Sequence, residues 1–545
     1  MNLKNEIKKF FKGDVFDDEE TLLKYSRDAG FFFVKPKLVV FPKDSQDIGK
    51  LVSFVSENKR DNPDLSLTAR SAGSDMSGGP LSESIIVEFD KYFNKVKEVG
   101  DNYAISEPGA YYRDFEKETL KRGLIFPPFP ASREICAIGG MVANNAGGEK
   151  SLIYGKTEDY VLRIKAVLRD GKEYIFEKIS AGELQNKIVQ NDLEGEIYKK
   201  VFEIIKNNFD KIKSAKPKVS KNSAGYNIFD VWDGGSFDMT KLLTGSQGTL
   251  GIITEAKLVL VPVKKYSKLL VIFLNDLNLL PKIVNTILEF KPESFETYDD
   301  HTFKLAVKFL PQIMKRMKGG AISLGIKFLP EVWMSLTGGV PKLILLPEFS
   351  GNDLNEINGR LEAAYEKLKP LGLKMRMTKS SEEAEKYQII RRESFTLLQE
   401  KVKDKQTAPF IDDLIVLPEY LPEVLPKLYK ILDEYPSLIF TIAGHIGDGN
   451  LHIIPLMNLD DPSQKAVIPK LMDEVFDLVL NYRGSITAEH NDGLIRSPYL
   501  KKMFGEEIYK IFEEIKNIFD PQNIFNPGKK VYSDLSYALK HMKGK

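Results

Sequence analysis

The stretch AIGGMVANNAGGEKSLIYG, residues 137–155, decides how the first half of this chain is expected to fold. It is the second of three glycine-rich clusters, between TARSAGSDMSGG (68–79) and TGSQGTLGIITEA (244–256). None of the three has the GxxxxGK or GxGxxG spacing, which excludes a nucleotide-triphosphate loop and a Rossmann fingerprint. Small residues at strand ends let the backbone approach a ligand, and their amides can form an anion-binding nest. Three such clusters in order, with Asn, Ser and Thr among the glycines, indicate a large phosphate-bearing cofactor.

Strand-like apolar runs alternate with amphipathic helices around these clusters, from residue 36 to about residue 262. KLVVFP (37–42) predicts a strand, and DSQDIGKLVSFVSENK (44–59) predicts a helix opened by capping residues. DYVLRIKAVLRDGKEYIF (159–176) predicts two strands joined by a DG turn. Farther on, strand–helix units such as KLLVIFLNDLNLLPKIVNTILEF (268–290) predict an antiparallel sheet backed by helices.

The composition narrows the function classes. A chain of 545 residues predicts two or three domains, and 78 basic against 77 acidic residues give no global field for nucleic acid. Cys136 is the one cysteine, which excludes an intramolecular disulfide and a Cys-ligated iron–sulfur cluster within this chain. The N-terminal stretch lacks a secretory signal, and no window holds eighteen uninterrupted apolar residues. The expected location is the cytoplasm, with the inner face of the membrane as an alternative.

Three of the five histidines fall in two turn-rich stretches, GHIGDGNLHI (444–453) and TAEHNDGLIR (487–496). His445 and His452 are seven residues apart, which in a continuous strand would put them on opposite faces. The intervening DG turn can fold the chain into a hairpin that brings both imidazoles to one side. With Glu489 they make a common three-ligand set for Zn²⁺ or a similar divalent ion.

The order of four longer motifs resembles the FAD-binding domain of the FAD-linked oxidase family, of the vanillyl-alcohol-oxidase type. These motifs are PKLVVFPKDSQDI, ARSAGSDMSGG, EPGAYYRDFEKETLKRGLIFPPFPASREICAIGGMVANNAGG and TGSQGTLGIITEAKL. The resemblance covers nearly all of residues 20–532, and it points to the branch of D-lactate, glycolate and D-2-hydroxyglutarate dehydrogenases. It implies an α+β chain in four parts: a helical segment 1–35, a two-part FAD-binding domain 36–262, an antiparallel, ferredoxin-like substrate domain 263–485, and a C-terminal helical segment 486–545 returning to the flavin.

The resemblance implies a non-covalent FAD held mainly by the glycine-rich loops. Residues 70–79 would wrap the pyrophosphate, 130–133 and 139–148 would line the flavin ring and ribityl chain, and 251–253 would lie on the adenine side, with Asn526 and Lys529 returning near the flavin. The expected cofactor residues are Arg70, Ser71, Ala72, Gly73, Ser74, Asp75, Ser77, Gly78, Pro130, Ser132, Gly139, Gly140, Asn144, Gly147, Gly148, Tyr154, Gly251, Ile253 and Asn526.

Two features of this domain bear on how the flavin is held. Ser71, Ser74 and Asp75 stand where relatives often have Gly, Thr and Gly, so the loop contacts are expected to differ in detail. No histidine precedes His301, which excludes a histidyl-linked flavin here. Cys136 is expected to be buried rather than bonded to the cofactor.

The histidine motifs match the metal and active-site motifs of the family. The resemblance implies His445, His452 and Glu489 as metal ligands, with zinc the favoured ion, and His490 as the general base. A 2-hydroxy acid would chelate the metal, which lowers the pKa of the hydroxyl; His490 would take the proton, and hydride would pass to flavin N5. Glu489 and His490 are adjacent, so both can serve one site only if the backbone bends there.

The substrate carboxylate needs a clamp, and IIRRESFTLLQEKVKDK (389–405) matches the family region that supplies it. We expect Arg392 and, one helical turn on, Thr396 to form this clamp, with Arg391 as the rival. A lysine common in D-2-hydroxyglutarate-type relatives has no clean equivalent in PFIDDLIVLP, and Ile454 replaces a polar residue. These departures favour a smaller substrate such as D-lactate.

Electrons are expected to leave to a separate acceptor: an iron–sulfur protein, a quinone or another carrier. The basic amphipathic segment 303–334 is a candidate for docking a partner or an anionic membrane, although a helix pair packed on its own domain fits the pattern as well. Two alternatives stay open. One is a flavin-dependent transferase like the alkylglycerone-phosphate synthases, which carry out no net oxidation. The other is a flavin subunit that is active only in a complex.

Overall fold

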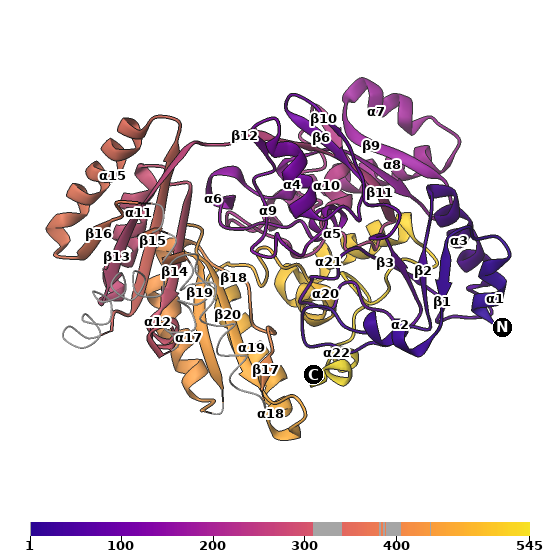
Figure 1. The fold of residues 1–545 in the computed structure, drawn as a ribbon. Helices are drawn as coiled ribbons and strands as arrows, with labels where there is room; N and C mark the ends of the chain where they lie inside the picture. Colours follow the sequence, from indigo (N-terminus) through magenta and orange to yellow (C-terminus); the bar gives the residue numbers. More distant parts are fainter. Residues whose placement is uncertain are drawn as a thin grey trace.

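The chain forms two lobes, and a C-terminal segment crosses back from the second lobe to the first (Figure 1). The computed structural model describes residues 2–308, 340–380, 383–384, 387–388, 405–436 and 438–544. The first lobe ends near β12 (Val261–Pro262), which pairs with β7 (Leu124–Ile125) at the point where the chain passes to the second lobe.

A small sheet of four strands opens the first lobe, in the order β1-β2-β4-β3. β2 and β3 run parallel to β4, whereas β1 is antiparallel to β2. Asp44 caps α3 by accepting the Asp47 N–H, and the buried apolar face of this helix packs against the sheet. The elements are β1 (Asp14–Phe16), β2 (Leu38–Phe41), β3 (Leu67–Arg70), β4 (Ile85–Glu88), α1 (Leu3–Lys8), α2 (Glu19–Lys24) and α3 (Ser45–Asn58).

A second, antiparallel sheet completes this lobe, in the order β10-β9-β8-β11-β6-β5. The expected DG turn joins β8 to β9, with Gly171 at a φ of +76°. The strands are β5 (Val96–Val99), β6 (Tyr103–Ser106), β8 (Val161–Val167), β9 (Glu173–Ser180), β10 (Ser236–Asp238) and β11 (Ile252–Val259). The helices are α4 (Tyr112–Leu120), α5 (Ile138–Asn144), α6 (Ser151–Tyr154), α7 (Ala181–Ile188), α8 (Leu193–Asn207), α9 (Phe209–Ala215), α10 (Thr240–Leu243) and the 3₁₀ turn η1 (Thr157–Asp159).

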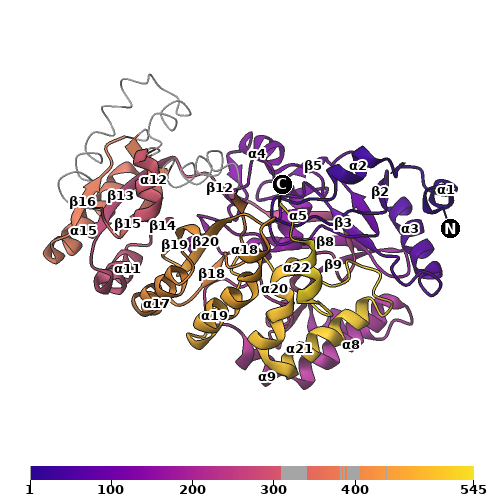
Figure 2. The ribbon, with the colours of Figure 1, turned by 90° about the horizontal axis from the view of Figure 1, so that it is seen from below.

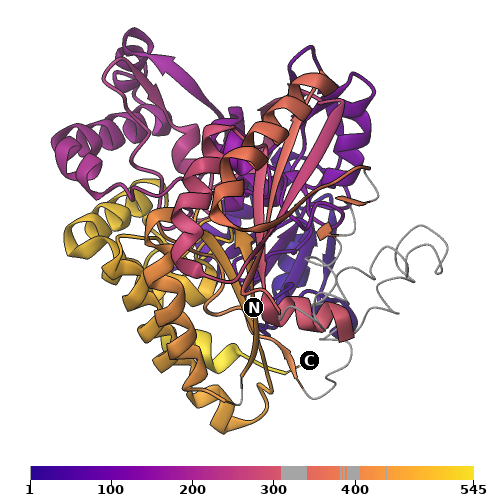
Figure 3. The same cartoon turned by 90° about the vertical axis from the view of Figure 1, so that its left-hand side faces the viewer.

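The second lobe is built on one antiparallel sheet, in the order β16-β13-β15-β14-β19-β20-β17, with β18 also pairing with β20. Helices cover the face of this sheet that points away from the first lobe. Figure 3 shows this face, with the left-hand side of Figure 1 turned toward the viewer. The strands are β13 (Tyr266–Leu274), β14 (Ser294–Asp299), β15 (Leu343–Gly351), β16 (Lys374–Met377), β17 (Gln406–Thr407), β18 (Leu414–Ile415), β19 (Ile439–His445) and β20 (Asn450–Met457). The helices are α11 (Leu280–Glu289), α12 (Asp300–Lys308), α15 (Leu354–Leu368), α17 (Leu421–Asp433), α18 (Pro462–Ala466), α19 (Ile468–Asn481), η2 (Leu277–Leu279), η3 (Lys369–Leu371) and η4 (Pro418–Tyr420).

The C-terminal segment packs against the first lobe, where α21 contacts α8 and α9 (Figure 2). Its elements are α20 (Gly493–Arg496), η5 (Ser497–Tyr499), α21 (Leu500–Phe519) and α22 (Leu535–His541). Beyond α21 the chain forms a parallel bridge between Phe525 and Leu67, beside β3. The expected α+β class, with an antiparallel second sheet, is confirmed. None of the described helices is long and apolar enough to cross a bilayer.

Candidate active site

A cavity of about 560 Å³ is lined by residues of both lobes. The first lobe contributes the loop 69–76, the segment 130–147 and the turn at Gln247 and Gly248. The second lobe and the C-terminal segment contribute the other wall: Thr302, Asp412, Thr441, Ala443, His445, His452, Ile454, Glu489 and His490. The volume falls in the range of small-molecule and cofactor sites, and the histidine motifs open into the same space as the glycine-rich loops.

Most of the expected cofactor residues line this cavity. They are Arg70, Ser71, Ala72, Gly73, Ser74, Asp75, Pro130, Ser132, Gly139, Gly140, Asn144, Gly147 and Ile253. Six others lie outside its lining: Ser77, Gly78, Gly148, Tyr154, Gly251 and Asn526. The Tyr154 hydroxyl instead donates a hydrogen bond to Oε1 of Glu293 at 3.2 Å. Asn526 lies behind the loops, where its side-chain amide donates to the carbonyls of Gly79 and Gln247.

Two glycines show how the loops leave room for a ligand. Gly73 has a φ of +65°, and a Cβ there would lie 2.2 Å from Nη2 of Arg70. The glycine therefore allows the buried Arg70 guanidinium to fold back under the loop, where Nη2 donates to the Arg27 carbonyl. At Gly140, by contrast, a Cβ would meet no atom within 4 Å.

Cys136 is buried as expected, and burial raises its pKa to about 12, so its thiol stays protonated at neutral pH.

The two motif histidines face each other across a hairpin. His445 ends β19, opposite Asn450, and His452 lies in β20, opposite Ala443, two residue pairs farther from the turn. The turn between the strands contains Gly449 at a φ of +77°. The two imidazole centroids are 5.2 Å apart. The expected hairpin geometry is therefore present, and both rings lie on the cavity side.

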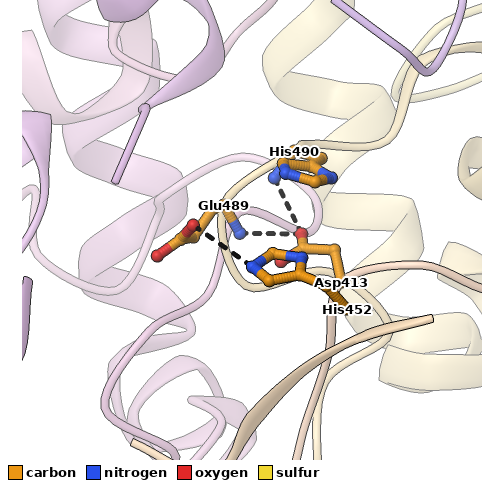
Figure 4. Close-up of side chains that lie close together, drawn as sticks. All are labelled: Asp413, His452, Glu489 and His490. Atoms are coloured by element: carbon orange, nitrogen blue, oxygen red, sulfur yellow. Dashed lines mark hydrogen bonds and ion pairs between the residues drawn. The ribbon is translucent and has the colours of Figure 1, made fainter. Parts of the chain in front are cut away.

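Glu489 and His490 follow a bent, non-strand segment, which lets these adjacent residues serve one site. The Asp413 carboxylate holds this bend: its Oδ2 accepts from Thr487 Oγ1 and from the backbone N–H groups of Glu489 and His490, at 2.7–2.8 Å. Figure 4 shows this carboxylate between the two backbone amides, with the Glu489 side chain directed toward His452. Asp413 itself has a φ of +67°, a conformation that Asp adopts more readily than most residues.

The Glu489 carboxylate lies near the Nε2 atoms of both His445 and His452, the other two expected metal ligands. Oε2 of Glu489 lies 3.3 Å from Nε2 of His445 and 3.9 Å from Nε2 of His452. Ligand atoms at about 2.1 Å from a tetrahedral zinc ion are roughly 3.4 Å apart, so these two separations are compatible with such an ion. Asp413, His452, Glu489 and His490 also present one ligand atom each within 4.8 Å of one another. His445 is not in this second group, and Oδ2 of Asp413 already accepts three hydrogen bonds.

The pKa values of His445, His490 and Glu489 are all shifted from their usual values. Burial opposes charge on His445 and His490, yet the carboxylates of Glu296 and of Asp413 with Asp412 raise their pKa values to about 9. Burial also opposes ionisation of Glu489, but Lys221 and His445 lower its pKa well below the usual range. The pKa of His490 is therefore higher than the near-neutral value expected from the sequence. A divalent cation beside it would lower that pKa by repulsion.

Some expected residues lie outside the described part of the chain. These are Arg391, Arg392 and Thr396, together with most of the segment 303–334, of which α12 reaches Lys308. The structure also adds site residues that sequence reasoning did not assign: Asp412, Asp413, Glu296 and Lys221. The DD pair in PFIDDLIVLP was a visible signal for two of them, whereas nothing in the sequence around Glu296 or Lys221 marks a site.

The two-lobed α+β fold, with glycine-rich loops and histidine motifs lining one cavity, is shared with solved structures. The fold is similar to a 4-ethylphenol oxidase from Gulosibacter chungangensis (TM-score 0.68, 16% identity, 98% of this chain and 97% of that chain) and to an alkyldihydroxyacetonephosphate synthase (TM-score 0.65, 15% identity, 96% and 84%). Residues 36–176 match the family described as FAD binding domain, and residues 263–530 match FAD linked oxidases, C-terminal domain. The chain belongs to the FAD-linked oxidase family, as the sequence motifs indicated.

Curated relatives of this chain carry names from one class of reaction. It is 27% identical to a D-2-hydroxyglutarate dehydrogenase of Pseudomonas putida, over 95% of this chain and 50% of the relative. It is 26% identical to the glycolate oxidase subunit GlcD of Bacillus subtilis (95% and 94%) and 25% identical to a D-lactate dehydrogenase of Archaeoglobus fulgidus (96% and 97%). The chain thus spans about half the length of some relatives and nearly all of others.

Proposed function

We propose that this protein is an FAD- and divalent-metal-dependent dehydrogenase that oxidises a D-2-hydroxy acid to the 2-keto acid. The observation that carries the proposal is the shared cavity, because it opens both to the glycine-rich FAD loops and to His445, His452, Glu489 and His490. The names of relatives that match over nearly their whole length support the same reaction class.

The cofactors supply what side chains cannot: FAD accepts a hydride, and a divalent ion acidifies the substrate hydroxyl. The chain supplies the rest. Nε2 of each of His445 and His452, with Oε2 of Glu489, would hold the ion. His490 stacks on His452, with ring centroids 5.1 Å apart, and lines the cavity beside the proposed ligands, where it would act as the base. Its neutral form takes the hydroxyl proton while the carbon loses hydride, and the two losses balance the conversion of alcohol to ketone.

The cavity wall beside the histidines favours a substrate with a small side chain. Thr441 and Ile454 pair across the hairpin, and Ala443 and His452 pair two positions nearer the turn; all four residues line the cavity. Among the described residues that line the cavity, Arg70 is the sole arginine or lysine, and it is held by Arg27 and Glu88 in the first lobe. This wall offers no described cation for a second substrate carboxylate, so D-lactate is preferred to D-2-hydroxyglutarate.

Flavin absorbance under anaerobic conditions tests the proposal. We expect D-lactate to bleach the oxidised flavin of the FAD-loaded protein faster than L-lactate, glycolate or D-2-hydroxyglutarate, and a chelator to abolish the bleaching. His490→Ala should slow it by about 10²–10⁴-fold, as expected for loss of a general base. His541→Ala changes a histidine of α22 outside the cavity and should leave the rate unchanged. An unchanged flavin spectrum with every acid, while metal is bound, would contradict the proposal and favour a transferase.

A second candidate is a flavin subunit that turns over only within a complex. The observation that favours it is the match to a protein named as a glycolate oxidase subunit over 94% of that relative. In this case the isolated chain would still be reduced by substrate, but steady-state turnover would require an added iron–sulfur protein, quinone or other carrier.

A further inference from the structure

Each of the three proposed ligands has a second polar atom, and each of these atoms contacts a buried charged side chain. Nδ1 of His445 lies 2.6 Å from Oε1 of Glu296. Nδ1 of His452 lies 3.2 Å from Oδ1 of Asp412. Oε1 of Glu489 accepts from Nζ of Lys221 at 2.6 Å. The atoms left over are the two Nε2 atoms and Oε2 of Glu489, which lies 3.3 Å from Nε2 of His445 and 3.9 Å from Nε2 of His452.

The three outer residues, Glu296, Asp412 and Lys221, come from separate parts of the fold. Glu296 lies in β14, which pairs with β19 beside the hairpin, and Asp412 lies in the loop before β18. Lys221 lies in the first lobe, in the connection between α9 and β10. Their side chains are 8%, 0% and 1% exposed. Charged residues are rarely buried this fully without a partner that needs them, and here each partner is a ligand.

These contacts also set the orientation of the ligand side chains. A carboxylate at Nδ1 sets the rotation of an imidazole and its tautomer, so that Nε2 carries the lone pair and points at the ion. The lysine at Oε1 leaves Oε2 of Glu489 as the coordinating oxygen. Its ammonium is itself held in place by Oδ2 of Asp448 at 3.1 Å.

We propose that Glu296, Asp412 and Lys221 are positioning residues that orient His445, His452 and Glu489 for a divalent cation, and that Asp412 also orients His490. The second role rests on the other oxygen of the same carboxylate, because Oδ2 of Asp412 lies 2.9 Å from Nδ1 of His490. One carboxylate thus faces a metal ligand and the base together. The Nε2 of His490 is left for the substrate proton.

The inference rests on the proposed metal site and is tested by metal binding to the FAD-loaded full chain. The variants Glu296→Gln, Asp412→Asn and Lys221→Met keep the side-chain volume and remove the charge. The matched control is Glu293→Gln: Glu293 is buried and paired with Lys150 and Lys264, near the same strand, and contacts none of the three ligands in the described structure. Zinc affinity is measured by competition with a chromophoric chelator, and ligand geometry by the visible spectrum of the Co²⁺ form. Thermal unfolding and FAD content identify any variant that fails to fold.

We expect each variant to lose about 10–100-fold in zinc affinity and to show an altered Co²⁺ spectrum, with Glu293→Gln unchanged. When metal is restored to saturation, Glu296→Gln should recover flavin reduction by substrate, whereas Asp412→Asn should stay slow because only Asp412 also contacts His490. Folded variants with wild-type affinity and spectrum would overturn the inference. If the wild-type chain itself binds no stoichiometric metal, the metal-dependent part of the proposed function fails first, which is a different result.

Discussion

Gly140 lies in the first turn of α5, at the wall of the cavity, with no atom within 4 Å of the place a Cβ would occupy. Glycine within a helix normally costs about 1 kcal/mol relative to alanine. The absence of any protein atom around this position means that the glycine is not required by packing among the described residues. We infer that it leaves room for the bound cofactor.

Gly140→Ala should therefore separate stability from cofactor binding. We expect the apo-protein to be unchanged or stabilised by up to about 1 kcal/mol in urea unfolding. FAD affinity should fall about tenfold or more, because forcing one methyl group into a filled contact costs about 1–3 kcal/mol. Gly182→Ala is the matched control, since Gly182 also lies in the first turn of a helix, α7, in open space. Equal FAD affinity in both variants would show that the flavin does not pack on Gly140.

At the level of single residues, the sequence marked the proposed ligands, which line the cavity, more clearly than the charged residues that contact them. His445 and His452 stood out because histidine is rare in this chain and recurs there beside turn residues, and Glu489 adjoins a third such histidine. Glu296 and Lys221 are a common acid and a common base, and only their burial against the ligands distinguishes them. Burial of a charged side chain depends on contacts between distant segments, which no local pattern encodes.

At the level of elements, the DG turns were sufficient to predict hairpins, and both β8–β9 and β19–β20 form as expected. The bend that carries Glu489 and His490 was expected on chemical grounds, but its cause was not. The cause is Asp413, a residue 76 positions upstream of Glu489, whose carboxylate accepts three hydrogen bonds from the segment 487–490.

Removal of the Asp413 carboxylate should destabilise this bend. Asp413→Ala leaves three buried donors without an acceptor, at about 1–3 kcal/mol each, and we expect urea unfolding to show a loss of several kcal/mol. Asp413→Asn should lose less, because it keeps an acceptor oxygen and tolerates the positive φ. Asp233 makes a matched control: it also accepts three hydrogen bonds within a turn, but at the surface. An Asp413→Ala variant no less stable than Asp233→Ala would show that the bend does not depend on this carboxylate.

At the scale of the whole molecule, the order of the motifs predicted both lobes and the return of the C-terminal segment. The contacts between the C-terminal segment and the first lobe were not predictable from the sequence. Several of them are made by fully buried lysines, and lysine is normally exposed. Lys156 donates to Ala488 O, and Lys530 donates to Ser223 O and Gly225 O while it pairs with Asp492 at 2.7 Å. These contacts connect the C-terminal segment to the first lobe directly behind the residues of the candidate site.

A double-mutant cycle on Lys530 and Asp492 tests whether this joint holds the molecule together. Both side chains are 0% exposed, so Lys530→Met leaves a buried, uncompensated carboxylate and should cost about 3–5 kcal/mol in urea unfolding. Asp492→Asn keeps an acceptor for the Gly225 N–H and removes the charge. The loss of unfolding free energy in the double variant should therefore be smaller than the sum of the two single losses, by about 2 kcal/mol or more.

Lys502→Met with Asp477→Asn repeats the cycle on an exposed pair at 2.8 Å, where the coupling should stay below about 1 kcal/mol. Equal coupling in the two cycles would mean that the C-terminal segment is held to the first lobe by its apolar packing, and that the buried ion pair contributes no more than a surface pair.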